Sequence, residues 1–154
     1  MAVGNDALAS NTSATAVGNI STATNTRAAA FGYGSIAGGA NSTALGSSSE
    51  ARASASTAVG NLAIAGGETA IAFGYSSSAS AGGAIAIGPG SVATITNDIA
   101  LGSAAIASGG NSMAIGTGSA GIHSNSVAFG PLDHTGTGVA TTTTNQIVLG
   151  TANH

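Results

Sequence analysis

Ala-Leu-Gly at residues 44–46 is followed 14 residues later by Ala-Val-Gly at 58–60 and then by Ala-Phe-Gly at 72–74. The same Ala–apolar–Gly tripeptide ends at ten glycines with a constant spacing of 14: Gly4, Gly18, Gly32, Gly46, Gly60, Gly74, Gly88, Gly102, Gly116 and Gly130. A strict short period is typical of one supersecondary unit stacked on copies of itself. The period therefore predicts a solenoid, and a scaffold rather than a pocket.

The composition limits what kind of core this solenoid can have. Of 154 residues, 5% are charged and 3% are aromatic, and Gly, Ala, Ser and Thr dominate. So few large side chains cannot fill a wide globular core, but they can fill a thin one between two closely spaced layers. Low charge and a positive mean hydropathy of +0.37 favour an ordered chain over a disordered one.

The same composition excludes several partners. Lysine is absent, Arg27 and Arg52 are the two basic residues, and the formal net charge is −3, which argues against nucleic acid. Without cysteine there is no disulfide framework and no thiolate metal site. No stretch reaches the length of an apolar membrane span, so we expect no membrane contact within this segment.

The first half of each repeat predicts one strand. Counting the repeat glycine as position 1, position 4 carries Ser or Ala and position 6 carries Ala, with Gly121 as the exception. Position 5 varies and includes Glu50. Because alternate residues of a strand share a face, positions 4 and 6 are predicted to point inward and position 5 toward solvent.

The second half predicts another strand over positions 11 to 14. Position 14 is always large and apolar, as in Leu45 and Phe73, and position 12 lies on the same face. We predict that these side chains point inward and fill the interior against the small residues of the first strand. The repeat glycine is expected at a turn that needs positive φ, so two strands and two turns form one coil of a flattened β-solenoid.

Position 13 is alanine in all ten tripeptides and, on this interpretation, points away from the interior. A face in water would carry polar or charged residues in many of the repeats. A flat face of small residues therefore predicts close packing against another copy. The alternative is that alanine is merely tolerated there. The predicted interface residues are Ala30, Ala44, Ala58, Ala72, Ala86, Ala100, Ala114 and Ala128.

Three coils end in Asn-Ser-x-Ala-apolar-Gly, at residues 41–46, 111–116 and 125–130. This motif and its period resemble the head repeats of trimeric autotransporter adhesins, the YadA-like head. The resemblance covers residues 2–130. It implies a left-handed parallel β-roll and a homotrimer that projects from a bacterial outer membrane. It also implies binding to host cells or extracellular matrix, through a surface protein or a glycan.

The C-terminal end departs from the repeat, because Gly130 and Gly150 are 20 residues apart. We therefore predict a β-roll over residues 1–130, an inserted loop over 131–144 and a terminal partial coil over 145–154. Pro131 lacks an N–H for a sheet ladder. The loop is the least repetitive surface, which makes Leu132, Asp133 and His134 candidate partner contacts.

No catalytic, cofactor or metal site emerges, and we expect no enzyme. Residues 116–121 satisfy G-x-G-x-x-G, but their glycines fall in the turns of the repeat, where a dinucleotide fingerprint would need a following helix. His123, His134 and His154 are too scattered for a metal site. Asp98 occupies position 11 on the predicted interface, where copies near an axis would repel unless hydrated, protonated or bridged by an ion. The simpler interpretation is that this column stays in water.

Three function classes remain. The first is a cell-surface adhesin head. The second is a trimeric phage or viral fibre segment on a virion, because similar rolls occur in fibres and residues 145–151 look somewhat like their endings. The third, an ice-binding solenoid, ranks lower because the threonines of position 12 give way to Ile71, Ile85 and Ile99.

Overall fold

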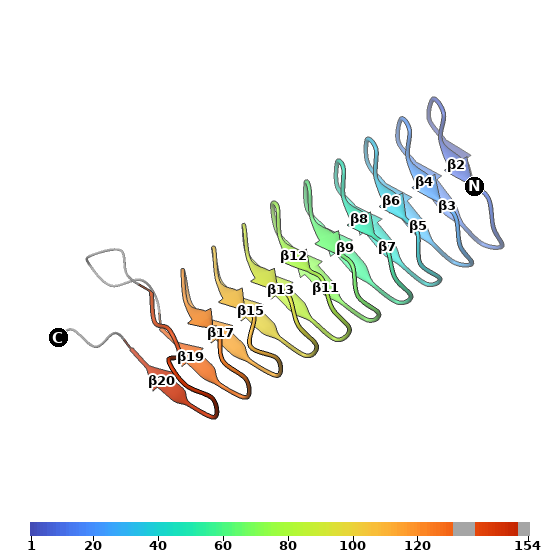
Figure 1. Ribbon diagram of the computed structural model, residues 1–154. Coiled ribbons are helices and arrows are strands. Elements are labelled where there is room, and N and C mark those ends of the chain that lie inside the picture. The colour runs from blue at the N-terminus through green and yellow to red at the C-terminus, as the bar shows by residue number, and fades with distance from the viewer. Residues whose placement is uncertain (131–137, 151–154) are drawn as a thin grey trace.

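The computed structural model describes residues 1–130 and 138–150, and all regular structure in those ranges is β-strand. The chain winds into a row of similar coils from the N-terminus to the C-terminus (Figure 1), with two short strands per coil as the sequence predicts. No helix that could cross a membrane occurs in these two ranges.

The strands form two parallel sheets, one on each side of the coils. Sheet A contains the second strand of each repeat: β1 (Ala2–Val3), β3 (Thr15–Val17), β5 (Ala29–Phe31), β7 (Thr43–Leu45), β9 (Thr57–Val59), β11 (Ile71–Phe73), β13 (Ile85–Ile87), β15 (Ile99–Leu101), β17 (Met113–Ile115), β19 (Val127–Phe129) and β20 (Ile147–Leu149). Sheet B contains the first: β2 (Leu8–Ala9), β4 (Thr22–Ala23), β6 (Ile36–Ala37), β8 (Glu50–Ala51), β10 (Ile64–Ala65), β12 (Ser78–Ala79), β14 (Val92–Ala93), β16 (Ile106–Ala107) and β18 (Ala120–Gly121).

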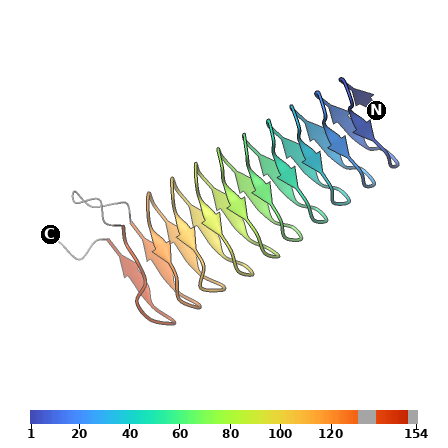
Figure 2. The ribbon, with the colours of Figure 1, turned by 45° about the horizontal axis from the view of Figure 1, so that its top comes forward.

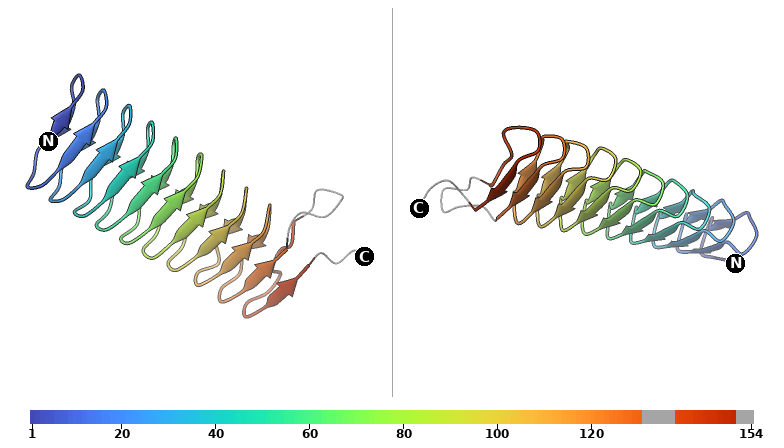
Figure 3. Two further views of the ribbon diagram at one scale, coloured as in Figure 1. Left: turned by 180° about the vertical axis from the view of Figure 1, so that it is seen from behind. Right: turned by 90° about the horizontal axis from the view of Figure 1, so that it is seen from below.

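Equivalent residues of successive coils pair directly. Ala44 pairs with Ala58, and Ala58 with Ala72, at the same position of the repeat. A view turned by 45° (Figure 2) and views from behind and from below (Figure 3) show the coils stacked along one axis. Each column of the sequence repeat is therefore a straight row of side chains along the solenoid.

The interior between the sheets holds mostly alanine and serine side chains, with Asp98 and Thr141 as larger exceptions. Sheet B contributes positions 4 and 6, which confirms the prediction for Ser35, Ala37 and their equivalents. Sheet A contributes positions 11 and 13, whose residues have almost no exposed surface except in the first and last coils. Between the sheets there is room for little more than a methyl or a hydroxymethyl group.

The prediction that positions 12 and 14 fill the interior is wrong. Phe73 is 53% exposed, whereas its neighbour Ala72 is fully buried. Large apolar side chains need not lie inside a chain whose two sheets are this close together. The two sheets instead pack through alanine and serine, which inverts the inward and outward faces of the second strand.

Most buried serines are compatible with this interior because their hydroxyl groups bond to a carbonyl oxygen of their own turn. Ser49 donates to the carbonyl oxygen of Gly46 at 2.9 Å, and Ser56 donates to that of Ala53 at 2.6 Å. No buried side-chain nitrogen or oxygen among the described residues lacks a partner. The polar atoms of the core therefore carry little of the cost of an unpaired buried group.

The repeat glycine is required for two reasons. Gly46 has a φ of +141°, in the range that disfavours residues with a side chain. A Cβ atom there would lie 2.5 Å from the carbonyl oxygen of Gly60 in the next coil. The expected positive φ is confirmed, and close stacking of the turns adds a second constraint.

The predicted loop ends earlier than residue 144. Ala140 bridges Ala120, and the Thr141 N–H donates to the Ala120 carbonyl at 2.9 Å, so the chain has rejoined sheet B there. Thr141 takes the place of an inward alanine and is 1% exposed. Residues 131–137 lie outside the described residues, and the terminal coil resumes by residue 138. Strand β20 then pairs with β19, with Leu149 beside Phe129.

Candidate functional site

The outer face of sheet A is the most unusual surface of the molecule. It consists of the side chains at positions 12 and 14, which point away from the interior. Leu45 is 48% exposed and Phe129 is 51% exposed. The position-14 row comprises Val3, Val17, Phe31, Leu45, Val59, Phe73, Ile87, Leu101, Ile115, Phe129 and Leu149.

This apolar face is continuous. In-register pairing places Val59 beside Phe73, and Phe73 beside Ile87, at the spacing of adjacent strands, about 4.8 Å. Neither position 12 nor position 14 carries a charged residue in any of these strands. A soluble monomer rarely exposes a contiguous apolar patch of this kind, and such patches mark interaction sites. Another surface could therefore cover this face without burying an unpaired charge.

The alanines predicted to form the interface do not lie on this face. Ala30, Ala44, Ala58, Ala72, Ala86, Ala100, Ala114 and Ala128 are all 0% exposed within a single chain. They contact the opposite sheet of their own chain, so the prediction that they contact another copy is wrong. The invariance of alanine reflects the narrow gap between the sheets. The outward residues of the same strands are the large ones that we had placed inside.

Asp98 is also buried, so the predictions that it lies on an interface or stays in water are both wrong. It is 0% exposed and lies in the interior rather than on an interface or in water. Its Oδ1 accepts hydrogen bonds from the Gly110 N–H, the Ser112 N–H and the Ser112 hydroxyl, at 2.9, 2.9 and 2.8 Å. Its Oδ2 accepts from the Ile95 N–H at 3.0 Å. The carboxylate thus joins the turns of two adjacent coils.

The remaining candidate residues do not converge on a chemical site. His123 is half-buried in a turn, and its Nδ1 lies 3.0 Å from the Thr141 carbonyl oxygen. His154 and the predicted contact residues Leu132, Asp133 and His134 lie outside the described residues. Residues 116–121 run from the turn after β17 into β18, with no helix following. In the described part of the chain, no three His, Cys, Asp or Glu side chains are grouped to hold a metal.

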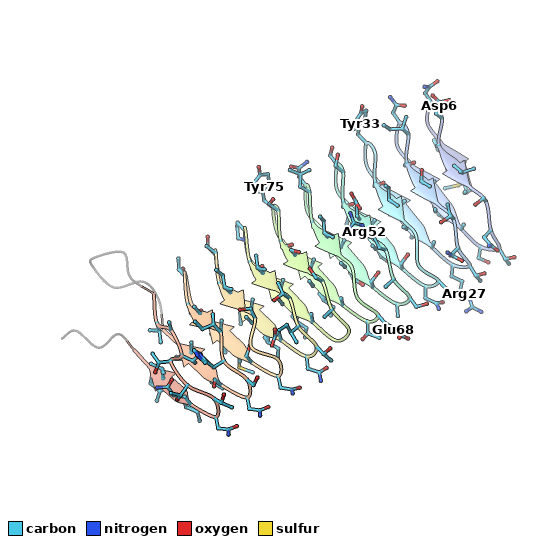
Figure 4. All side chains as sticks on the ribbon, viewed as in Figure 1. Asp6, Arg27, Tyr33, Arg52, Glu68 and Tyr75 are labelled. Atoms are coloured by element: carbon cyan, nitrogen blue, oxygen red, sulfur yellow. The ribbon has the colours of Figure 1, made fainter. Side chains whose placement is uncertain are left out.

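The outer face of sheet B is flat and mixed in character. Position 5 points outward, as predicted, and position 7 flanks it. Glu50 and Arg52 form an ion pair at 2.5 Å on this face. The two edges of the solenoid carry the other labelled side chains (Figure 4): Asp6, Tyr33 and Tyr75 lie along one edge, and Arg27 and Glu68 along the other.

Comparison with known proteins identifies a sequence family and a similar solved structure. The family described as YadA head domain repeat (2 copies) matches residues 1–19, 9–35, 37–63, 65–91 and 96–119. The crystal structure of the collagen-binding domain of the Yersinia adhesin YadA is similar, with a TM-score of 0.71 and 26% sequence identity. The match covers 84% of this chain and 69% of that one. No curated protein matches the chain.

Proposed function

The chain belongs to the family of YadA head domain repeats and is an adhesin head, and from that premise we propose that three copies assemble through the outer face of sheet A. The assembly projects from a bacterial outer membrane and binds host cells or extracellular matrix without catalysing a reaction. The observation that carries the proposal is the continuous row of exposed apolar side chains on sheet A.

Burying this row supplies the free energy of assembly. Removing one Leu, Ile or Phe side chain from water is worth about 1.5–3 kcal/mol. The position-14 row offers such a side chain in every coil, and position 12 adds Ile71, Ile85 and Ile99. Identical rows on identical chains suit a symmetric interface. The number of copies rests on the family resemblance and is open to direct measurement.

Sheet B becomes the outward surface when sheet A is buried in such an assembly. It is then the broad face available to a ligand. The similar Yersinia domain is described as collagen-binding. We propose that a matrix protein is the ligand class here too, with other host-surface proteins or glycans as the alternatives. Neither comparison favours a viral fibre.

Two isoleucines of similar exposure on opposite sheets provide the test. Ile87 of sheet A is 36% exposed and Ile36 of sheet B is 38% exposed. Ile87→Asp would place a charge in each copy of the proposed interface, whereas Ile36→Asp would place it in water. Light scattering should give a trimer for the unmodified chain and for Ile36→Asp, and a smaller species for Ile87→Asp. A monodisperse monomer of the unmodified chain would refute the proposal.

The ligand class has its own assay. The trimer should adhere to surfaces coated with collagen and not to surfaces coated with albumin. Retention of the trimer without adhesion to any matrix or host-cell surface would leave the assembly standing and remove the adhesive function.

A further inference from the structure

The outward residues at position 5 of sheet B alternate between apolar and polar from one coil to the next over the first seven coils. Position 5 is apolar in every second coil, at Leu8, Ile36, Ile64 and Val92. The coils between them carry Thr22, Glu50 and Ser78. The residues at position 5 therefore form two interleaved series with a spacing of two coils. One series is apolar and the other is polar.

The structure places these residues in one straight line. Direct pairing joins Leu8 to Thr22, Thr22 to Ile36 and Ile36 to Glu50. The line continues from Glu50 to Ile64, from Ile64 to Ser78 and from Ser78 to Val92. Leu8 is 50% exposed and Ile36 is 38% exposed, whereas Ile64 and Val92 are half-buried. The aliphatic side chains therefore form a regular series of contacts parallel to the solenoid axis.

The spacing of this series matches one kind of ligand backbone. Adjacent strands are about 4.8 Å apart, so successive aliphatic residues are about 9.6 Å apart. A polyproline II helix advances about 3.1 Å per residue and repeats every three residues, or about 9.3 Å. Over the three intervals from Leu8 to Val92 the two repeats drift apart by only about 1 Å.

The chemistry between the aliphatic residues also fits that backbone. A polyproline II chain makes no internal hydrogen bonds, so its carbonyl groups need donors from outside. Thr22 and Ser78 present hydroxyl groups between the apolar contacts. The one charged residue of the row, Glu50, is paired with Arg52, so the face presents no net charge to a neutral ligand.

We propose that the position-5 row of sheet B binds a neutral single chain in the polyproline II conformation, with every third ligand residue against one aliphatic side chain. The inference rests on the proposed function for the exposure of this face. Ile106 sits one coil after Val92, out of phase with the series, and makes no in-phase contact.

The test uses trimers of the full chain and two probes, a triple-helical Gly-Pro-hydroxyproline peptide and a single-chain oligoproline, with binding measured by calorimetry. Ile64→Ser should weaken binding of the oligoproline by about tenfold, the effect of losing one buried aliphatic contact. Binding of the triple-helical peptide alone would contradict the proposal. The double variant Ile64→Ser with Ser78→Ile keeps the amino-acid composition but moves the aliphatic contact by one coil. Its binding should be weakened as much as that of Ile64→Ser. Ile106→Ser, the same substitution out of phase, should change binding less than about threefold.

Each outcome bears on the proposal. Equal losses of affinity for Ile64→Ser and Ile106→Ser would show that the ligand binds to a generally apolar surface. They would contradict the proposed two-coil spacing of the contacts. Restored binding in the double variant Ile64→Ser with Ser78→Ile would also contradict that spacing. An unmodified trimer that adheres to a globular matrix protein but binds neither probe would overturn this inference and leave the adhesive function intact. Failure to form the trimer at all would count against the proposed function instead.

Discussion

The carboxylate of Asp98 accepts two hydrogen bonds from Ser112 in the next coil, one from the main-chain N–H at 2.9 Å and one from the hydroxyl at 2.8 Å. Most other coils have Ser or Ala at the position of Asp98, which makes this contact specific to one junction. The same carboxylate holds the Gly110 N–H of the following turn. Asp98 therefore stabilises a local junction in an otherwise uniform stack.

Replacing Asp98 tests that role. Asp98→Ala should remove the acceptor for the N–H groups of Ile95, Gly110 and Ser112 and lower the free energy of unfolding by about 3 kcal/mol, because each unpaired buried group costs about 1–3 kcal/mol. Asp98→Asn keeps the Oδ1 acceptor but turns an NH2 group toward the Ile95 N–H, so a loss of about 1 kcal/mol is expected. Denaturant unfolding measures both. Equal stability of Asp98→Ala and the unmodified chain would contradict the assignment.

Two adjacent alanines of β5 test which face of the second strand points inward. Ala30 is fully buried and Ala29 points outward. Ala30→Leu should destabilise the fold by about 1–3 kcal/mol or more, because the gap between the sheets has no room for it. Ala29→Leu should not, since Ile71 and Ile85 occupy the same column. Chemical denaturation followed by circular dichroism distinguishes them, and the reverse order would restore the orientation predicted from the sequence.

Two glycines of different surroundings test the turn geometry. Gly46→Ala should cost more than about 2 kcal/mol, because positive φ adds strain to a clash with the Gly60 carbonyl. Gly38 has no positive φ, and a Cβ atom there would have its nearest contact at 3.6 Å. Gly38→Ala should therefore change the free energy of unfolding by less than about 0.5 kcal/mol. Similar losses in both variants would show that close stacking at Gly46 is not the constraint.

The opposite turn offers a stabilising substitution. Ala55 has a φ of +55°, at a position that is asparagine in five other coils. In that column the Asn97 Nδ2 donates to the Asn111 Oδ1 at 3.2 Å. Because asparagine tolerates the left-handed region better than alanine, Ala55→Asn should raise the free energy of unfolding by about 0.5–1 kcal/mol. Ala40→Asn, one position earlier in its coil and without positive φ, should give no gain.

The sequence predicted the fold because the repeat is strict. Glycine spacing alone located every coil to Gly130, and small residues at positions 4 and 6 identified one inward face correctly. The orientation of the second strand could not be decided in the same way. Its two faces are alanine on one side and Phe, Ile or Leu on the other, and burial of the larger face is correct only when a chain folds alone. Here the larger face is exposed on the surface of the chain.

Two other features required the structure for different reasons. The loop boundary was placed too late because Thr141 substitutes for an inward alanine, and the repeat pattern does not reveal a threonine in that role. The alternation of Leu8, Ile36 and Ile64 was visible in the sequence at two-coil intervals. Its meaning depends on position 5 lying on an exposed flat sheet with direct pairing between coils.

Assembly through sheet A should be linked to thermal stability. If the outer face of sheet A is removed from water only in the assembly, the melting temperature should rise with protein concentration, because association favours the folded chain by mass action. Phe73 and Tyr75 are a matched pair for testing this, being 53% and 59% exposed and two residues apart. Phe73 lies on sheet A, whereas Tyr75 lies on the turn edge.

Phe73→Ala should lower the melting temperature at every concentration and weaken assembly, because each copy loses an aromatic side chain from the interface. Tyr75→Ala should leave both unchanged, since its ring stays in water in either state. Scanning calorimetry across about a hundredfold range of concentration measures the effect. A melting temperature independent of concentration, together with equal effects of the two substitutions, would show that sheet A is not the assembling face.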